Sequence, residues 1–453
     1  MPRCTTVLLL TATLALGAYP AGGQGWKLVA SLDPEVGRNG ECSSIVADSD
    51  LYTHICSYNG AAGDLRHTWM DATGWHSEAV DTAGDVGRYC SAAVDRYDRL
   101  CVAYADATNQ TLRYARQGDG RWMLETVPDI HTECGYISLA LDSRGYAHVS
   151  FYDLMNLNLV YVVESPEGWR SEVVDAEPNC GGYCSLALDD RDGAHIAYHD
   201  SVNSALKYAW QEDGRWLIRS IVEKDVGGDV SLDLDRNDYP VIAYRETTEA
   251  GSSLNCARES RDGWRVRTVD PGGDLGYYTS VKAALHGNVY VSYTDVGNRS
   301  LKIAEWNGRD WSCTHAGGTS WFMATASSLC VDLKDCVRVS CFAEPMLCYV
   351  TNFNRPPTLP TLTLTPERPG PGGPITATVT GCTDPDLDTV DYFYKWSVLV
   401  DGNWTARADR RTVETTNVLP AGTTRRGEVW RCLVQAYDGV EYSEVVQQQV
   451  TIE

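Results

Sequence analysis

Aromatic and acidic residues recur at matching places along the chain, in a pattern suited to binding sugars. Seven short apolar runs end in an aromatic residue, and in six of them an acid follows two positions later. Aromatic faces stack on sugar rings, and carboxylates accept hydrogen bonds from sugar hydroxyls. Strand-end tyrosines and aspartates also bind neighbouring backbone groups, so the same pattern fits a structural role. The aromatic residues are Tyr58, Tyr104, Phe151, Tyr198, Tyr244, Tyr293 and Phe342, and the acids are Asp106, Asp153, Asp200, Glu246, Asp295 and Glu344.

A second set of side chains stands at the entry to the preceding run of each repeat. We call this the ring position; it holds Tyr89, Tyr136, Tyr183, Tyr278, Asp229, Ala326 and either Cys42 or Ser43. In antiparallel strands, the entry to the first strand and the exit from the second open on the same face. The predicted ligand-binding residues are therefore Tyr89, Tyr136, Tyr183, Tyr278, Asp229, Tyr104, Tyr244 and Tyr293.

One sector of the repeat breaks the pattern and could carry catalysis. The residue between the aromatic and the acid is Tyr152, His199 and Arg245 in three consecutive repeats. A histidine and a tyrosine can abstract and donate a proton next to a carboxylate of the substrate, and an arginine can neutralise that carboxylate. β-Elimination of an acidic polysaccharide requires these groups. If the protein is an enzyme, the catalytic candidates are His199, Arg245, Tyr198 and Tyr152. Drift of surface loops on a non-catalytic protein explains the same variation.

Seven tryptophans, spaced by 47 to 49 residues, determine the architecture that must position these side chains. Each interval contains four short runs of β-branched, aromatic and small apolar residues, separated by turn residues. Four strands repeated seven times predict an all-β, seven-bladed β-propeller. Residues 26–31 carry a tryptophan strand without a repeat of its own, so we expect it to complete the seventh blade. The tryptophans are Trp26, Trp75, Trp122, Trp169, Trp216, Trp264 and Trp311.

The repeat resembles a known group of secreted bacterial propellers. Residues 183–216, YCSLALDDRDGAHIAYHDSVNSALKYAWQEDGRW, are similar to the repeats grouped with BNR, or sialidase-like, propellers, and the resemblance covers 26–353. It implies the propeller fold. The chain departs from the Asp-box pattern SxDxGxxW, because the nearest match, Ser260 to Trp264, has another spacing. An arginine triad of the sialidase type is not visible either, so sialidase activity is not implied.

The C-terminal quarter of the chain has a different character. Residues 354–360 form a proline-rich linker, and 361–453 contain strand-like runs without the tryptophan period. The order Cys382, Trp396, Cys432 predicts a cross-sheet disulfide over a tryptophan, and the region resembles bacterial immunoglobulin-like modules. Residues 384–388 look like the DPDxD loop of such modules, which binds calcium in some of them and is a polar turn in others. Calcium is thus a possible ligand, and no other cofactor or metal is expected.

Composition restricts the compartment and the partners. Residues 1–23 have the basic, apolar and small-residue order of a secretory signal, which leaves a propeller over 24–353. Export favours disulfides among the 16 cysteines. A hairpin expected over residues 341–348 places Cys341 opposite Cys348, which predicts a second disulfide. The net charge of −23 disfavours nucleic acids and anionic membranes.

The sequence therefore predicts a secreted or cell-surface protein without a membrane span. Its leading function is non-catalytic recognition or adhesion, through an extracellular glycan bound at the channel mouth of the propeller. One alternative is a polysaccharide-degrading enzyme, a lyase before a hydrolase, and another is a scaffold for a cell-surface protein. Repeated sites suit a multivalent binding protein, whereas an enzyme should break the repeat in one sector.

Overall fold

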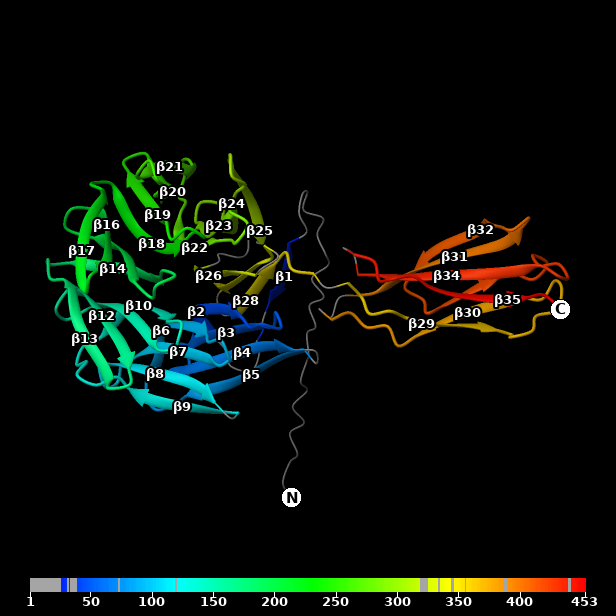
Figure 1. Cartoon of the computed structure of the whole chain (residues 1–453), viewed down its shortest axis with the longest axis horizontal. Helices are drawn as coiled ribbons and strands as arrows, with labels where there is room; N and C mark the ends of the chain where they lie inside the picture. Colours follow the sequence, from blue (N-terminus) through cyan, green and yellow to red (C-terminus); the bar gives the residue numbers. More distant parts are fainter. Residues whose placement is uncertain are drawn as a thin grey trace, which may run out of the picture.

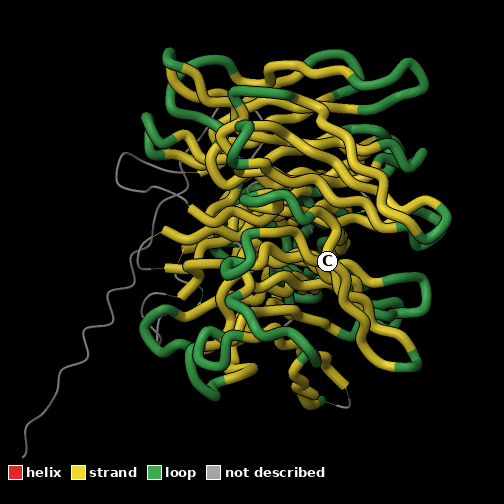
Figure 2. Tube along the Cα trace, turned by 90° about the vertical axis from the view of Figure 1, so that its left-hand side faces the viewer, coloured by secondary structure: helices red, strands yellow, loops and turns green. Residues whose placement is uncertain are grey.

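The described part of the chain consists of β-strands joined by turns and loops (Figure 2). The computed structural model describes residues 26–30, 32, 39–71, 74–118, 120–317, 325–332, 335–343, 346–354, 356–385, 389–438 and 441–453. Within these ranges there is no helix, and hence none that is long and apolar enough to cross a membrane. The expected secretory signal, the tip of the 341–348 hairpin and positions 386–388 of the DPDxD loop lie outside the described residues.

Seven four-stranded antiparallel sheets make up the first three quarters of the chain, and we number them in chain order. Sheet 1 consists of β2 (Asn39–Ala47), β3 (Thr53–Asn59), β4 (Asp64–Asp71) and β5 (Gly74–Asp81), and sheet 2 of β6 (Val86–Val94), β7 (Leu100–Asp106), β8 (Thr111–Gly118) and β9 (Arg121–Thr126). Sheet 3 consists of β10 (Cys134–Leu141), β11 (Ala147–Asp153), β12 (Asn158–Ser165) and β13 (Gly168–Asp175), and sheet 4 of β14 (Cys180–Leu188), β15 (Ala194–Asp200), β16 (Ala205–Glu212) and β17 (Arg215–Val222).

Sheets 5 to 7 follow the same plan, except that sheet 7 takes its outer strand from the N-terminal part of the chain. Sheet 5 consists of β18 (Val226–Leu234), β19 (Pro240–Thr248), β20 (Gly251–Arg258) and β21 (Arg265–Asp270). Sheet 6 consists of β22 (Tyr277–Ala283), β23 (Val289–Asp295), β24 (Ser300–Trp306) and β25 (Trp311–Gly317). Sheet 7 consists of β26 (Thr325–Val331), β27 (Val337–Ala343), β28 (Met346–Thr351) and β1 (Lys27–Ala30). The register pairs Lys27 with Thr351 and Ala30 with Cys348. This confirms the expected role of residues 26–31 in covering the last sheet edge.

The second strand of each sheet is buried because sheets lie against both of its faces. Every residue of β7, β11, β15, β23 and β27 is buried, whereas the outer strand β9 is mostly exposed. A strand covered on both faces needs a continuous apolar run and not an alternating one, which explains sequences such as LCVAYAD in β7. Figure 1 shows the seven sheets arranged around a common centre, which fits a propeller.

Serine hydroxyls hold the first strands of all seven sheets in a closed circle. Each of these serines lies two residues after a ring position and accepts a hydrogen bond from a backbone N–H of the next sheet, at 2.9–3.2 Å. The last bond, from Ile45 N–H to Ser328 Oγ, joins sheet 1 to sheet 7. The serines are Ser44, Ser91, Ser138, Ser185, Ser231, Ser280 and Ser328. The sequence analysis did not single out this serine, although the Tyr-x-Ser spacing is visible in four repeats.

The periodic tryptophans fasten the outer parts of neighbouring sheets. At five interfaces a tryptophan packs edge-on against a ring from the third strand of the preceding sheet, with ring centroids 5.1–5.6 Å apart. Such T-shaped contacts are favourable for aromatic pairs. The pairs are Trp122 with His67, Trp169 with Tyr114, Trp216 with Tyr161, Trp264 with Tyr208, and Trp75 with Tyr349.

The C-terminal strands form two further sheets around a core of their own. Trp396 and Trp430 are almost fully buried in it, and Trp396 Nε1 donates to Asn417 Oδ1 at 2.8 Å. The strands are β29 (Thr361–Thr365), β30 (Ile375–Thr380) and β33 (Thr416–Leu419) in one sheet, and β32 (Asn403–Thr412), β31 (Asp391–Val400), β34 (Val429–Tyr437) and β35 (Val446–Thr451) in the other.

Candidate functional site: a tyrosine rim beside a histidine and an arginine

The ring positions share an unusual backbone conformation. Tyr89, Tyr136, Tyr183, Asp229 and Tyr278 all have φ between 50° and 54°, in the left-handed region that non-glycine residues seldom occupy. Each lies where the pairing between the first and second strands shifts register. A β-bulge of this kind re-aims a side chain, and strained residues often gather at functional sites.

Three of the predicted tyrosines, Tyr89, Tyr136 and Tyr183, contact one another in series, and Tyr278 lies beyond Asp229 in the same ring of positions. We call these four residues the tyrosine rim. The ring centroids of Tyr136 and Tyr183 are 4.4 Å apart, and those of Tyr89 and Tyr136 are 5.4 Å apart. Tyr278 remains 42% exposed. Tyr152, a catalytic candidate, is buried but lies 6.4 Å from Tyr136, ring to ring. The structure thus brings together aromatic groups from four sheets on one face.

His199 and Arg245 lie beside this rim, as their places in the repeat predict. The imidazole of His199 is 6.2 Å from the Tyr183 ring, and its Nε2 is 3.0 Å from the carbonyl oxygen of Val226. Arg245 Nε donates to Asp229 Oδ2 at 2.8 Å, and its other nitrogens donate to Thr247 Oγ1 and Gly227 O.

Tyr277 completes this sector and was not among the sequence candidates. The Arg245 guanidinium stacks over its ring at 4.3 Å from the centroid. Asp229 Oδ1 accepts a hydrogen bond from the Tyr278 backbone N–H at 2.9 Å, so one carboxylate holds both the arginine and the next sheet. The doubled Tyr277–Tyr278 in the sequence was the available signal.

Burial determines the protonation of these groups. It lowers the pKa of His199, and the positive charge of Arg245 lowers it further, against the opposing effects of the Val226 carbonyl and Asp200. Burial likewise raises the pKa of Tyr136 and Tyr278. At neutral pH the sector therefore presents a neutral imidazole, protonated phenols and the guanidinium of Arg245.

Tyr104, Tyr244 and Tyr293, which were predicted to bind ligand, and Tyr198, a catalytic candidate if the protein is an enzyme, are buried at the ends of their strands. All four are at most 1% exposed. Tyr104, Tyr198 and Tyr293 donate to Asp81, Asp175 and Asp270, which end the outer strand of the preceding sheet. A basic residue, Arg113, Lys207 or Lys302, pairs with the same carboxylate. These networks tie adjacent sheets together.

The repeated acids also serve the fold. Asp106, Asp153, Asp200 and Asp295 each accept a backbone and a side-chain hydrogen bond from the asparagine three residues later. The carboxylate thereby closes the turn after the second strand. For these four acids the contacts fit a structural role, and Glu344 lies outside the described residues.

One group of possible metal ligands is already occupied by a side chain. Oxygen or sulfur atoms of Asp175, Glu177 and Cys180 lie within 4.8 Å of one another. The Lys207 ammonium contacts all three, at 3.2 Å for Asp175 Oδ2 and 3.4 Å for Cys180 Sγ. Because the ammonium neutralises these acids, the group fits an internal ion pair better than a metal centre.

The described residues contain neither of the two predicted disulfides. Cys341 and Cys348 lie directly opposite one another in the register, as expected, and burial raises the pKa of Cys341. Cys432 lies opposite Trp396, and the side chain of Cys382 hydrogen-bonds to that of Tyr392. No disulfide occurs elsewhere among the described residues.

Comparison with known proteins finds only distant structural likenesses. No family model and no curated protein matches the chain. An ulvan lyase structure is 12% identical, with 71% of this chain and 92% of that one aligned at a TM-score of 0.44. A protein of unknown function from Dyadobacter fermentans is 11% identical (58% and 93%, TM-score 0.43), and a mutant NanB sialidase from Streptococcus pneumoniae is 12% identical (68% of each, TM-score 0.39). Likenesses this distant carry no activity over to this chain.

Proposed function

We propose that this protein is an extracellular recognition protein that binds glycan at the tyrosine rim. In this proposal the seven sheets are the blades of a seven-bladed β-propeller, and β29–β35 form an immunoglobulin-like module that acts as a spacer or attachment domain. The protein is exported by the segment 1–23, and the glycan belongs to a cell surface or an extracellular matrix.

The single observation that carries the proposal is the contact between tyrosines of different sheets at strained ring positions. Tyr136 and Tyr183 lie within stacking distance, and Tyr278 presents a partly exposed ring nearby. Their phenolic groups are protonated, so each offers a hydrogen-bond donor together with an apolar face. Sugars require this combination of flat apolar surface and directed polar groups.

The test compares glycan binding by wild type with that of Tyr278→Ala and Tyr136→Ala. Alanine is compatible with this backbone because Ala326 occupies the same ring position with φ 52°. Binding to a glycan panel, followed by co-elution and by isothermal titration, should weaken at least tenfold in each alanine variant. It should recover only in part in Tyr278→Phe, which keeps the apolar face and loses the hydroxyl donor. Tyr97→Ala removes a 62% exposed tyrosine from a turn remote from the rim and should change nothing. Unchanged binding in the rim variants would place the glycan elsewhere, and absence of binding to every glycan would favour a protein partner.

A second candidate function, cleavage of an acidic polysaccharide, rests on the sector of His199 and Arg245. A neutral imidazole beside a guanidinium could accept a proton while the arginine stabilises a carboxylate. The same panel distinguishes the two functions, because a lyase shortens its substrate and creates an unsaturated product that absorbs ultraviolet light. His199→Ala should abolish that product if the sector is catalytic, and it should leave plain binding within about twofold if it is not.

A further inference from the structure

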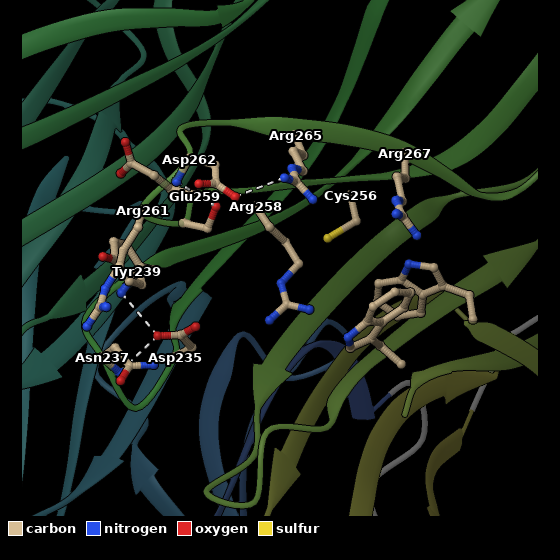
Figure 3. A pocket seen from close by; sticks show the side chains of 13 residues that line it. Asp235, Asn237, Tyr239, Cys256, Arg258, Glu259, Arg261, Asp262, Arg265 and Arg267 are labelled. Atoms are coloured by element: carbon tan, nitrogen blue, oxygen red, sulfur yellow. Dashed lines mark hydrogen bonds and ion pairs between the residues drawn. The ribbon is translucent and has the colours of Figure 1, made fainter. Parts of the chain in front are cut away.

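A basic groove opens between sheets 5 and 6, at the end of the strands opposite to the tyrosine rim. Ring positions lie at the start of each first strand, whereas the groove is lined from the β18–β19, β20–β21 and β24–β25 turns. It has a volume of about 750 Å³. Its lining includes Trp306 and Trp311. It also includes four arginines, which Figure 3 labels: Arg258, Arg261, Arg265 and Arg267. We call it the arginine groove.

The groove lies where the repeat lacks its usual aromatic ring. Cys256 occupies the third-strand position that holds a tyrosine or histidine at the five interfaces where a periodic tryptophan packs on a ring. Trp311 is the periodic tryptophan of this interface, so a thiol faces it where Tyr208 faces Trp264. The missing ring leaves space that the neighbouring interfaces fill with aromatic packing.

Three arginines share the face of sheet 5 that bears Cys256. Arg267 lies opposite Cys256 in the strand register, and Arg258 lies opposite Arg265. Like charges directly opposite one another destabilise a sheet. One acid offsets part of this charge, because Asp262 pairs with Arg265 at 3.1 Å on the exposed edge. Within a chain of net charge −23, this is a local concentration of positive charge.

Stacking orients two of these arginines with their donors available. The guanidinium carbons of Arg258 and Arg267 lie 5.8 Å and 5.4 Å from the centroid of Trp306. Stacking engages the face of a guanidinium and leaves its N–H groups, which lie in the plane, for an anion. Two further acids, Asp235 and Glu259, line the groove, so four arginines face three carboxylates, and Asp235 accepts the backbone N–H groups of Asn237 and Tyr239.

We propose that the arginine groove binds an acidic oligosaccharide, with a carboxylate or sulfate group on Arg258 and Arg267 and a sugar ring against Trp311. Arginine pairs with such anions through two parallel hydrogen bonds, and half-buried tryptophan faces are good surfaces for pyranose rings. A second hollow of about 400 Å³ between sheets 4 and 5 shares Asn237, Tyr239 and Glu259 with the groove and adds Arg219 and Trp264. An oligosaccharide can therefore extend from one interface to the next.

The decisive variant is Cys256→Tyr, which restores the side chain that the repeat has at Tyr114, Tyr161 and Tyr208. The new ring should fill the groove against Trp311 and leave the fold intact. The probe is a chondroitin 4-sulfate tetrasaccharide, with binding measured by isothermal titration at low salt. We expect Cys256→Tyr to weaken binding at least tenfold, and Cys256→Ser, which loses the thiol without filling the space, to change it less than twofold.

Charge variants test the anion contacts separately. Arg258→Gln and Arg267→Gln should each weaken binding about tenfold, and affinity should fall as salt is raised. Arg121→Gln removes an exposed arginine from sheet 2 and serves as the matched control. The tetrasaccharide with its sulfates removed and its carboxyls reduced should not bind. Free sulfate should compete only weakly if Trp311 contributes to the affinity for the sugar.

Three results would overturn the proposal: equal affinity for the neutral tetrasaccharide, unchanged binding in Cys256→Tyr, or a loss in Arg121→Gln equal to that in the groove variants. The rim variants Tyr136→Ala and Tyr278→Ala should leave this binding unchanged. Failure of glycan binding at the rim and failure of anion binding at the groove are therefore separate outcomes.

Discussion

Asp229 should be the most sensitive residue of the candidate sector, and Asp229→Asn tests this with almost no change of shape. Its side chain is buried and accepts Arg245 Nε at 2.8 Å and the Tyr278 N–H at 2.9 Å. An amide has one acceptor oxygen and one donor nitrogen, so whichever way it turns, an N–H faces another N–H. The substitution also removes the only carboxylate recorded in contact with the Arg245 guanidinium among the described residues.

The expected cost is about 3 kcal/mol of unfolding free energy. A hydrogen bond to a charged group contributes about 1.5–3 kcal/mol, and a buried donor left without its acceptor costs about 1–3 kcal/mol. The two figures partly describe the same loss, so they are not added in full. Arg245 keeps its bonds to Gly227 O and Thr247 Oγ1 and its stack on Tyr277, which places the sum below the larger losses seen when buried ion pairs are broken.

Guanidinium unfolding at pH 7, followed by tryptophan fluorescence, measures this change. Asp225→Asn is the matched control, since Asp225 also has positive φ but is 44% exposed and pairs only loosely with Lys224 at 3.4 Å. It should shift the unfolding free energy by less than about 0.5 kcal/mol. An Asp229→Asn protein as stable as the control would refute the argument that this carboxylate holds Arg245 and sheet 6 in place.

Three further outcomes follow from the buried networks. Tyr198→Phe should cost about 1–2 kcal/mol by removing the 2.8 Å bond to Asp175, with glycan binding unchanged; lost binding in a folded variant would return Tyr198 to the site. Lys207→Met should cost about 3–5 kcal/mol in denaturant unfolding, because two buried acids lose their cation, and an unaffected variant would contradict the ion-pair assignment. The free energy of unfolding should fall as pH drops below about 6.5, the ordinary pKa of histidine. Burial lowers the pKa of four histidines in the folded protein, so the unfolded chain binds more protons in this range. Each histidine should lower the free energy of unfolding by at most about 1.4 kcal/mol per pH unit. Denaturant titrations from pH 7.5 to 5 measure this slope, and a flat profile would be inconsistent with buried neutral imidazoles at His67, His148, His195 and His199.

The repeat in the sequence was sufficient to predict the strands and the way they group. The strand after Trp26 has no repeat of its own, and the seventh repeat lacks its tryptophan strand. The two were therefore expected to pair, and β1 does pair with β28. The ring positions were also predictable, because strand order alone decides that entries to first strands and exits from second strands share a face. Tyr136, Tyr183 and His199 are close together for that reason.

The tertiary structure alone decided which of those side chains are exposed. Tyr183 and Tyr198 have the same chemistry and lie at neighbouring strand ends, yet a bulge turns Tyr183 towards the rim, and Asp175 of the preceding sheet buries the hydroxyl of Tyr198. The arginine groove was equally hidden, because Cys256 looks unremarkable until Trp311 is seen to face it. A local pattern specifies backbone direction, whereas accessibility depends on what a neighbouring sheet, 20 to 50 residues away in the chain, places against each side chain.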